Sequence, residues 1–178
     1  MSGKSNIILI GFMGSGKTSV GKFLANKLGH DFKDTDKMIE EEQKCTVQSI
    51  FATKGEKYFR HLETETIKNL NDKLNNTILS TGGGLPITEG NGVLLRQLGQ
   101  VIFLRAKKDT IRKRLAGDNT RPLLAGSDQE EKMEALLNQR TPVYETVAHR
   151  IIDTDNKSLD EIAKEIMENR SQYEITCD

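Results

Sequence analysis

The sequence predicts an α/β fold of three layers, in which a five-stranded parallel sheet is covered by helices on both faces. Short apolar or β-branched runs alternate along the chain with longer segments of helical periodicity, which is the pattern of successive βαβ units. At 178 residues, the chain is long enough to bury a core without disulfides or structural metals. No repeat, low-complexity tract or linker divides it, so we expect one domain over residues 1–178.

The strands are expected where β-rich runs are bounded by turn residues or charges. Their ranges are 6–11, 31–33, 77–81, 100–105 and 150–152, which include the sequences NIILIG, TILST, QVIFLR and RII. Helices are expected at 17–28, 35–53, 56–74, 90–98, 108–116, 129–148 and 158–170. The pattern of 35–53 allows either one helix or two. The last helix begins with Ser158 and Glu161, which have the spacing of a capping box.

Charge and composition exclude several classes of function. Lys and Arg together number 26, as do Asp and Glu, so no basic excess indicates a nucleic-acid surface. No stretch approaches the roughly 20 apolar residues of a membrane span, and the apolar run near the N-terminus lacks a signal-peptide cleavage site. Cys45 and Cys177 do not have the spacing of metal ligands. We expect a cytoplasmic protein, without nucleic-acid or membrane partners, that acts as a monomer.

The clearest motif is GFMGSGKT at 11–18, which matches G-x-x-x-x-G-K-[ST] between an expected strand and an expected helix, as a phosphate-binding loop (P-loop) requires. Its glycines let backbone N–H groups point at phosphate oxygens, and the helix N-terminus adds its positive dipole end. Lys17 is expected to reach the β and γ phosphates, and the Thr18 hydroxyl to ligate Mg²⁺. The predicted ATP-binding residues of this loop are Gly14, Ser15, Gly16, Lys17, Thr18 and Ser19.

The segment FKDTDKM at 32–38 holds the carboxylates expected to serve the metal and the acceptor. A motor ATPase would show an apolar strand ending in an acid for Mg²⁺, but the run at 77–81 ends in Ser80 and Thr81. If 31–33 is a parallel strand, Asp34 and Asp36 emerge at the same sheet edge as the P-loop. Asp34 is then the candidate for the metal side, and Asp36 for a hydroxyl to be phosphorylated. Read alone, the segment is more typical of a solvated turn with a helix N-cap, and it is its place at the edge of the sheet that favours function.

Three further features predict a site for a small anionic acceptor. Arg60 lies in an expected helix, with Glu63 at i+3 to fix its side chain, and Arg140 lies near the helix break at Pro142. Gly82, Gly83 and Gly84 follow the strand 77–81 and permit close approach of the backbone to a ligand. Each has an alternative reading, as a surface charge or a flexible loop.

The segment at about 115–128 is rich in loop-forming residues, and we expect it to be a mobile lid. It carries Arg121, and Arg114 precedes it near the end of an expected helix. An arginine brought in by a closing lid stabilises the charge of a transferring phosphoryl group, and the lid excludes water.

Taken in order, the P-loop, DTD, GEKYFR..E, GGG, RPLLAG, R.P.Y and the late DTDNK make the chain resemble the shikimate kinase family, P-loop kinases similar in fold to the nucleoside monophosphate kinases. The resemblance implies transfer of the γ-phosphate of ATP to the 3-hydroxyl of shikimate, in aromatic amino-acid biosynthesis. It assigns shikimate to Asp36, Arg60, Gly82, Gly83, Gly84 and Arg140. It makes Lys17, Asp36 and Arg121 catalytic, and places Mg²⁺ on Thr18 and, through water, Asp34. Arg114, Arg121 and Asp155 complete the ATP site.

The segment at about 33–61 would then bind the substrate and the segment at about 115–128 would be the lid. Two alternatives stay open. Another small-molecule P-loop kinase, such as a gluconate kinase, would also need arginines and an aspartate for an anionic polyol. A nucleotide-binding regulator without turnover would need neither Asp36 nor a lid arginine.

Overall fold

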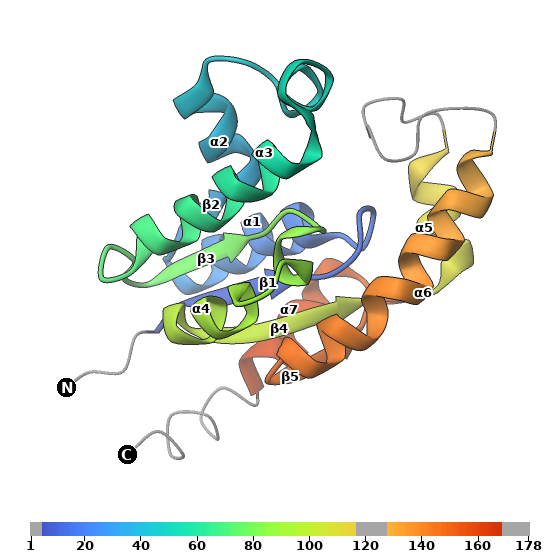
Figure 1. Cartoon of the computed structure of the whole chain (residues 1–178). Coiled ribbons are helices and arrows are strands. Elements are labelled where there is room, and N and C mark those ends of the chain that lie inside the picture. The colour runs from blue at the N-terminus through green and yellow to red at the C-terminus, as the bar shows by residue number, and fades with distance from the viewer. Residues whose placement is uncertain (1–4, 117–127, 169–178) are drawn as a thin grey trace.

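The computed structural model describes residues 5–116 and 128–168. In this part of the chain, five strands form one sheet in the order β2-β3-β1-β4-β5, and every neighbouring pair is parallel (Figure 1). The strands are β1 (Ile7–Ile10), β2 (Asp31–Asp34), β3 (Thr77–Ser80), β4 (Gln100–Arg105) and β5 (Arg150–Asp153). The predicted five-stranded parallel sheet is therefore confirmed.

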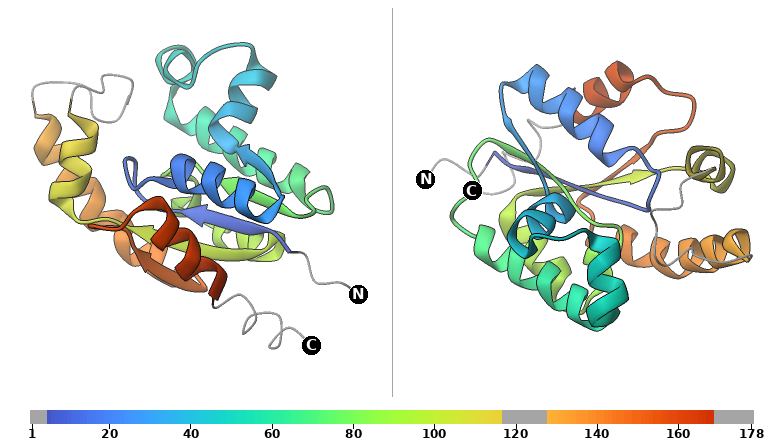
Figure 2. Two further views of the ribbon diagram at one scale, coloured as in Figure 1. Left: turned by 180° about the vertical axis from the view of Figure 1, so that it is seen from behind. Right: turned by 90° about the horizontal axis from the view of Figure 1, so that it is seen from above.

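Helices cover both faces of the sheet, also as predicted. They are α1 (Lys17–Leu28), α2 (Thr35–Gln43), α3 (Val47–Leu70), α4 (Asn91–Leu98), α5 (Lys108–Leu115), α6 (Gln129–Val147) and α7 (Leu159–Glu168), with a 3-10 turn η1 (Leu85–Ile87). Because side chains alternate along a strand, Ile7 and Leu9 of β1 pack with α1 and α7, whereas Ile8 and Ile10 pack with α3, α4 and α6. The view from above in Figure 2 shows these two helical layers on either side of the sheet.

The expected segment at 35–53 consists of two helices, and its second part continues past the expected boundary. Helix α2 ends at Lys44, whose φ is 57°, and α3 begins after Thr46, whose hydroxyl accepts a hydrogen bond from the N–H of Ser49. Helix α3 then runs through Gly55, where φ 81° and ψ 171° are not helical. The boundary expected between 53 and 56 is therefore a kink inside α3.

The predicted capping box at the start of α7 is present. The N–H of Ser158 donates to the Glu161 carboxylate at 2.7 Å, and the N–H of Glu161 donates to the Ser158 hydroxyl at 3.2 Å. No helix of the described residues is long and apolar enough to cross a membrane. The predicted lid at about 115–128 falls mostly on residues 117–127, which lie outside the described residues.

The register of the strands brings the predicted functional segments to one edge of the sheet. Ser80 of β3 is paired with Leu9 of β1 on one side and with Asp34 of β2 on the other. The P-loop, the start of α2 and the glycines after β3 consequently emerge side by side at the carboxyl ends of the strands, where open α/β sheets bind ligands.

Candidate active site

The P-loop joins β1 to α1 and is shaped by its glycines. Gly11, Gly14 and Gly16 have φ values of 147°, 77° and 99°, a region that other residues rarely adopt. Gly16 is the N-cap of α1, and no side chain caps this helix. The first N–H groups of α1 therefore remain available to a phosphate, together with the positive end of the helix dipole.

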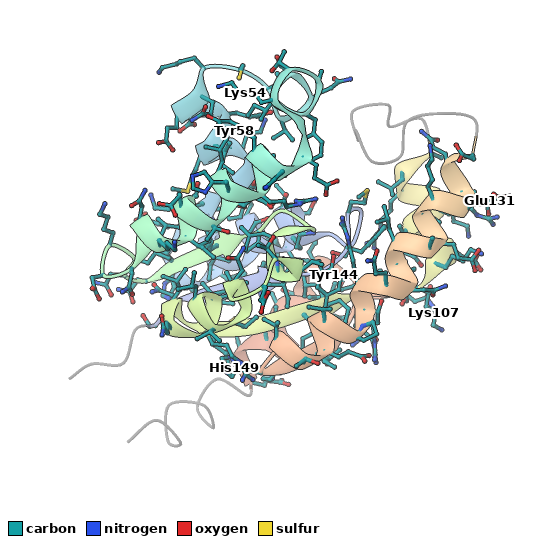
Figure 3. The ribbon with its side chains drawn as sticks, viewed as in Figure 1. Lys54, Tyr58, Lys107, Glu131, Tyr144 and His149 are labelled. Atoms are coloured by element: carbon teal, nitrogen blue, oxygen red, sulfur yellow. The ribbon has the colours of Figure 1, made fainter. Side chains whose placement is uncertain are left out.

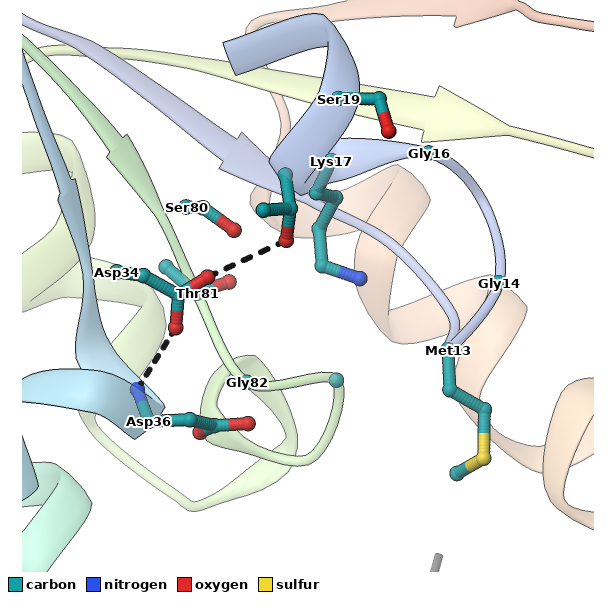
Figure 4. Close-up of a pocket in the computed structure, with 12 residues that line it drawn as sticks. Met13, Gly14, Gly16, Lys17, Ser19, Asp34, Asp36, Ser80, Thr81 and Gly82 are labelled. Carbon is teal, nitrogen blue, oxygen red and sulfur yellow. Dashed lines mark hydrogen bonds between the residues drawn. The ribbon is translucent and has the colours of Figure 1, made fainter. Parts of the chain in front are cut away.

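Lys17 is buried, and its ammonium group lies inside the curl of the P-loop (Figure 4). It donates hydrogen bonds to the carbonyl oxygens of Gly11 at 2.8 Å and Phe12 at 3.0 Å. This loop thus holds a positive charge next to the N-terminus of α1, which is the arrangement that polyphosphate binding requires.

Asp34 contacts the P-loop helix with one carboxylate oxygen and caps α2 with the other (Figure 4). Its Oδ2 accepts a hydrogen bond from the Thr18 hydroxyl at 3.3 Å. Its Oδ1 accepts from the N–H groups of Asp36 at 3.0 Å and Lys37 at 3.4 Å. The N-cap interpretation and the functional interpretation of FKDTDKM are therefore compatible, since a single carboxylate occupies both positions.

These groups line a cavity of about 180 Å³, which we call the nucleotide cavity. Its lining residues are Met13, Gly14, Gly16, Lys17, Thr18, Ser19, Asp34, Asp36, Ser80, Thr81, Gly82 and Gly83. Ser15, which was predicted with the loop, is buried and does not line this cavity.

A second cavity of about 60 Å³, the acceptor cavity, adjoins the first. Its lining residues are Met13, Asp36, Val47, Phe51, Phe59, Arg60, Glu63, Gly82, Gly83, Gly84 and Arg140. The structure thus brings together all six residues that the resemblance assigned to the substrate. Asp36 lines both cavities, and so lies where a hydroxyl in one would meet a phosphate in the other.

Arg60 is held in the acceptor cavity by two carboxylates of α3. Its Nη1 donates to Glu63 at 2.8 Å, and its Nη2 donates to Glu56 at 2.8 Å. Burial disfavours the charged form of Arg60, but the two carboxylates outweigh it and raise the pKa of the guanidinium. Arg60 therefore stays positively charged.

Glu63 is fully buried, and its Oε1 has no hydrogen-bond partner among the described residues. Burial raises the pKa of its carboxyl to about 7, an effect that Arg60 opposes and the charge of Asp36 reinforces. The acceptor cavity therefore contains a carboxyl group that changes its charge near neutral pH.

Arg140 reaches the acceptor cavity from α6, and its side chain is buried. Its guanidinium lies 5.9 Å from the ring centroid of Phe12, and that of Arg60 lies 5.7 Å from the ring centroid of Phe59. Two guanidinium groups in one small cavity, one buried and one partly exposed, favour a ligand with a carboxylate, which they can bind through paired hydrogen bonds.

None of the three glycines after β3 has a positive φ, but space requires two of them, Gly82 and Gly84. A side chain on Gly82 would lie 2.6 Å from the Asp36 carboxylate and 2.7 Å from that of Glu63. A side chain on Gly84 would overlap the guanidinium of Arg60. The glycines thus let the charged groups of the acceptor cavity touch the backbone.

The remaining predicted residues line neither cavity or lie beyond the described part. Arg114 of α5 donates to the carbonyl oxygen of Gly14 at 3.0 Å and so lies against the P-loop. Asp155 lines neither cavity, but accepts hydrogen bonds from the Lys107 N–H at 3.1 Å and the Thr110 hydroxyl at 2.5 Å, which fixes the start of α5. Arg121 lies outside the described residues.

Several lining residues were not predicted from the sequence. Phe51 and Phe59 have the spacing of ordinary core positions on a helix, and Met13 and Val47 have no distinguishing pattern. From the sequence, Ser80 and Thr81 served only to show that this strand does not end in an acidic residue. Their position at the end of β3, beside the P-loop strand, would have identified them as residues that line the site.

Comparisons with known proteins agree with this geometry. A family model described as shikimate kinase matches residues 13–170. A shikimate kinase from Symbiobacterium thermophilum is 42% identical over 165 residues, which are 92% of this chain and 94% of the relative. One from Moorella thermoacetica is 43% identical over 163 residues, 92% of each chain.

Solved structures give the same result. A shikimate kinase from Acinetobacter baumannii in complex with shikimate has a TM-score of 0.91 and 35% identity, covering 97% of this chain and 96% of that one. A gluconokinase from Sinorhizobium meliloti has a TM-score of 0.59 at 15% identity and covers 99% of this chain and 97% of that one, a likeness that shows the fold alone. The chain therefore belongs to the shikimate kinase family of ATP-dependent small-molecule kinases.

Proposed function

We propose that this chain transfers the γ-phosphate of ATP to the 3-hydroxyl of shikimate, giving shikimate 3-phosphate and ADP. The observation that carries the proposal is that the nucleotide and acceptor cavities share Asp36, Gly82 and Gly83, so two substrates would meet at one carboxylate. Family membership supports shikimate as the acceptor.

On the acceptor side, Arg60 and Arg140 would bind the shikimate carboxylate through paired hydrogen bonds. The backbone of residues 82–84 would hold neighbouring hydroxyls. Asp36 would accept a hydrogen bond from the reacting hydroxyl and orient it toward the phosphate, which is the role of the aspartate in phosphoryl transfer.

On the nucleotide side, the P-loop N–H groups and Lys17 would bind the β and γ phosphates, and Lys17 would balance the charge that spreads over the transferred group. Arg114 would flank the nucleotide from the end of α5. Asp155 would act through α5, because it binds the first turn of that helix.

The residues present fit a bound Mg²⁺ ion. The Thr18 hydroxyl and Asp34 supply hard oxygen donors 3.3 Å apart at the edge of the nucleotide cavity. Among residues 5–116 and 128–168, no three His, Cys, Asp or Glu side chains gather as a metal site. This agrees with an ion held partly by phosphates and water, as Mg²⁺ usually is. Such an ion would neutralise phosphate charge, with Thr18 binding it directly and Asp34 through water.

Both cavities are lined by one chain, so we propose that a monomer suffices for turnover, which light scattering at assay concentration would test. We also propose that the protein acts in the cytoplasm.

The deciding experiment measures ADP release from ATP and Mg²⁺ with shikimate, gluconate, AMP or no acceptor. Turnover with shikimate alone is expected. Turnover with gluconate or AMP instead would keep the kinase chemistry and reject the proposed acceptor. ATP binding without turnover on any acceptor would favour the regulator.

The matched variants are Arg60→Ala and Arg140→Ala, with Arg96→Ala on α4 as a control arginine outside both cavities. Loss of either acceptor arginine should raise the shikimate KM by about 10- to 100-fold, the size of one charged hydrogen bond, with the ATP KM nearly unchanged. Unchanged shikimate kinetics in both variants would remove these arginines from the site.

A further inference from the structure

Tyr144 of α6 (Figure 3) lines neither cavity but is hydrogen-bonded to Gly83, which lines both. Its side chain is fully buried, and its ring lies 5.1 Å from that of Phe103 between centroids. Its hydroxyl donates a hydrogen bond of 2.6 Å to the carbonyl oxygen of Gly83. Phenylalanine would fill the same space, so the hydroxyl is the part of this residue that packing alone does not explain.

The hydrogen bond fixes the orientation of one peptide group. The carbonyl of Gly83 and the N–H of Gly84 belong to the same planar trans peptide, so they point in opposite directions. Holding the carbonyl toward Tyr144 therefore turns the N–H of Gly84 away from the interior. Gly84 lines the acceptor cavity, and within residues 5–116 and 128–168 its N–H has no hydrogen-bond acceptor.

A glycine-rich segment would not keep this orientation by itself, because glycine allows many backbone conformations. The surroundings of Gly83 do not hold the peptide by close packing. A side-chain carbon there would lie 3.4 Å from both the carbonyl oxygen of Gly11 and the N–H nitrogen of Met13, and 3.6 Å from Nη1 of Arg140, which are ordinary van der Waals distances. Gly83 thus lies next to the P-loop and an acceptor arginine with room to spare, so the hydrogen bond from Tyr144 is what orients its peptide.

The Tyr144 hydroxyl is suited to act as a permanent donor. Burial raises its pKa to about 12, although the neighbouring positive charge of Arg140 acts to lower it. Tyr144 follows Arg140 by one helical turn, so both lie on one face of α6. The phenol therefore stays protonated at neutral pH and continues to hold the Gly83 carbonyl.

We infer that Tyr144 is a positioning residue for the acceptor: its hydroxyl holds the Gly83–Gly84 peptide so that the Gly84 N–H faces the acceptor cavity as a hydrogen-bond donor. The inference rests on the proposed function, and it concerns how the site is held in shape. Tyr144 acts through Gly83 and touches neither substrate.

The test compares Tyr144→Phe with Tyr58→Phe, a matched loss of one phenol on α3 outside both cavities. Tyr144→Phe should raise the shikimate KM about tenfold, the size of one lost hydrogen bond, and keep the ATP KM within about twofold. Tyr58→Phe should change neither. If the Tyr144 hydroxyl contributed only to folding, Tyr144→Phe would lower the amount of active enzyme and the apparent kcat. The shikimate KM would then not rise selectively. Wild-type shikimate KM in Tyr144→Phe would overturn the inference and leave the proposed function standing.

A second measurement does not depend on turnover. In ¹⁵N-labelled protein with assigned glycine amides, shikimate should shift the Gly84 amide resonance of the wild type, and Tyr144→Phe should shift the Gly83 and Gly84 resonances without ligand. If the wild-type enzyme fails to phosphorylate shikimate, the proposed function fails and the ligand-free spectra decide the inference. Unchanged Gly83 and Gly84 resonances in the variant overturn it. If Tyr144→Phe does not fold, the wild-type spectra decide the inference. A Gly84 amide resonance that does not shift when shikimate binds would then overturn it.

Discussion

At the scale of single residues, the raised pKa of Glu63 leads to a prediction about the pH dependence of shikimate binding. Its pKa is raised to about 7, so it is neutral below that pH and anionic above it. The anionic form competes for Arg60 and repels a carboxylate ligand. We therefore predict that the shikimate KM rises as pH increases through about 7. Glu63→Gln should flatten this dependence because the amide keeps the shape of the neutral acid.

The control is Glu65→Gln, which changes an exposed carboxylate of the same helix that pairs with Lys68. Its pH profile of the shikimate KM should match that of the wild type. Parallel profiles for the wild type and Glu63→Gln between about pH 6 and pH 8.5 would show that another group is responsible.

Asp34 offers a separable test of the metal side. Asparagine caps helices as well as aspartate does, so Asp34→Asn should preserve α2 while removing the negative charge. We predict that the Mg²⁺ concentration giving half-maximal rate rises about tenfold, a loss of about 1.4 kcal/mol of interaction with the ion. Titrating Mg²⁺ at fixed ATP, beside a thermal melt, measures both effects. Wild-type Mg²⁺ dependence would remove Asp34 from the metal side.

The acceptor residues show what the sequence could and could not predict at this scale. The pairing of Arg60 with Glu63 follows from their i, i+3 spacing on a helix and was predicted. The burial of Glu63 next to Asp36 was not, because it depends on how α3 packs against α2 and the backbone at Gly82. Distances between such elements are not encoded in local spacing.

At the scale of elements, the kink in α3 depends on Gly55. Its φ of 81° and ψ of 171° lie in a region that only glycine occupies readily, although a side chain there would contact nothing within 4 Å. We predict that Gly55→Asn lowers the free energy of unfolding by about 1–3 kcal/mol through backbone strain alone. Urea unfolding measures this loss.

Gly29 is the matched control, because it also has open space but lies in the left-handed helical region, with φ 64° and ψ 35°. Asparagine tolerates that region, so Gly29→Asn should cost less than about 1 kcal/mol. Equal losses in the two variants would mean that the conformation of Gly55 is not the cause.

The kink also explains why the helix boundaries were less predictable than the strands. A glycine inside a helical pattern usually marks a break, so an end was expected near 53. The packing of Phe59 against Ile39 and Ile50 lets the helix resume beyond Gly55. That packing is a contact between α3 and α2, and the periodicity of a single segment cannot predict a contact with another helix.

At the scale of the whole molecule, Asn6 connects segments at the edge of the sheet opposite the site. Its buried side chain donates to the carbonyl oxygens of Leu74 and Leu98, and accepts a hydrogen bond from the N–H of Thr77. We predict that Asn6→Ala lowers the free energy of unfolding by about 2–4 kcal/mol, because buried backbone groups lose their partners. The shikimate and ATP KM values should not change.

Exposed Asn75 supplies the comparison, and Asn75→Ala should unfold at nearly the wild-type urea concentration. A similar small effect of Asn6→Ala would contradict the importance of these buried hydrogen bonds for the fold.

The overall architecture was predictable because alternating strands and helices permit few arrangements, and a parallel sheet brings its carboxyl ends to one edge. That was enough to place the P-loop, Asp34, Asp36 and Gly82 together before the structure was known. The order of the strands in the sheet was not predictable. A run such as NIILI is buried on both faces, and its sequence does not indicate which strands pair with it.

The nearness of Gly83 to the P-loop has a consequence for protein engineering. The space beside Gly83 is bounded by main-chain atoms of Gly11 and Met13 and by the side chain of Arg140, so these groups would set how far the phosphate donor stands from its acceptor. Exchanging Arg60, which lies against Gly84 instead, would change which acceptor is bound while leaving that spacing as it is. The scaffold keeps the transfer distance and lets selectivity vary independently.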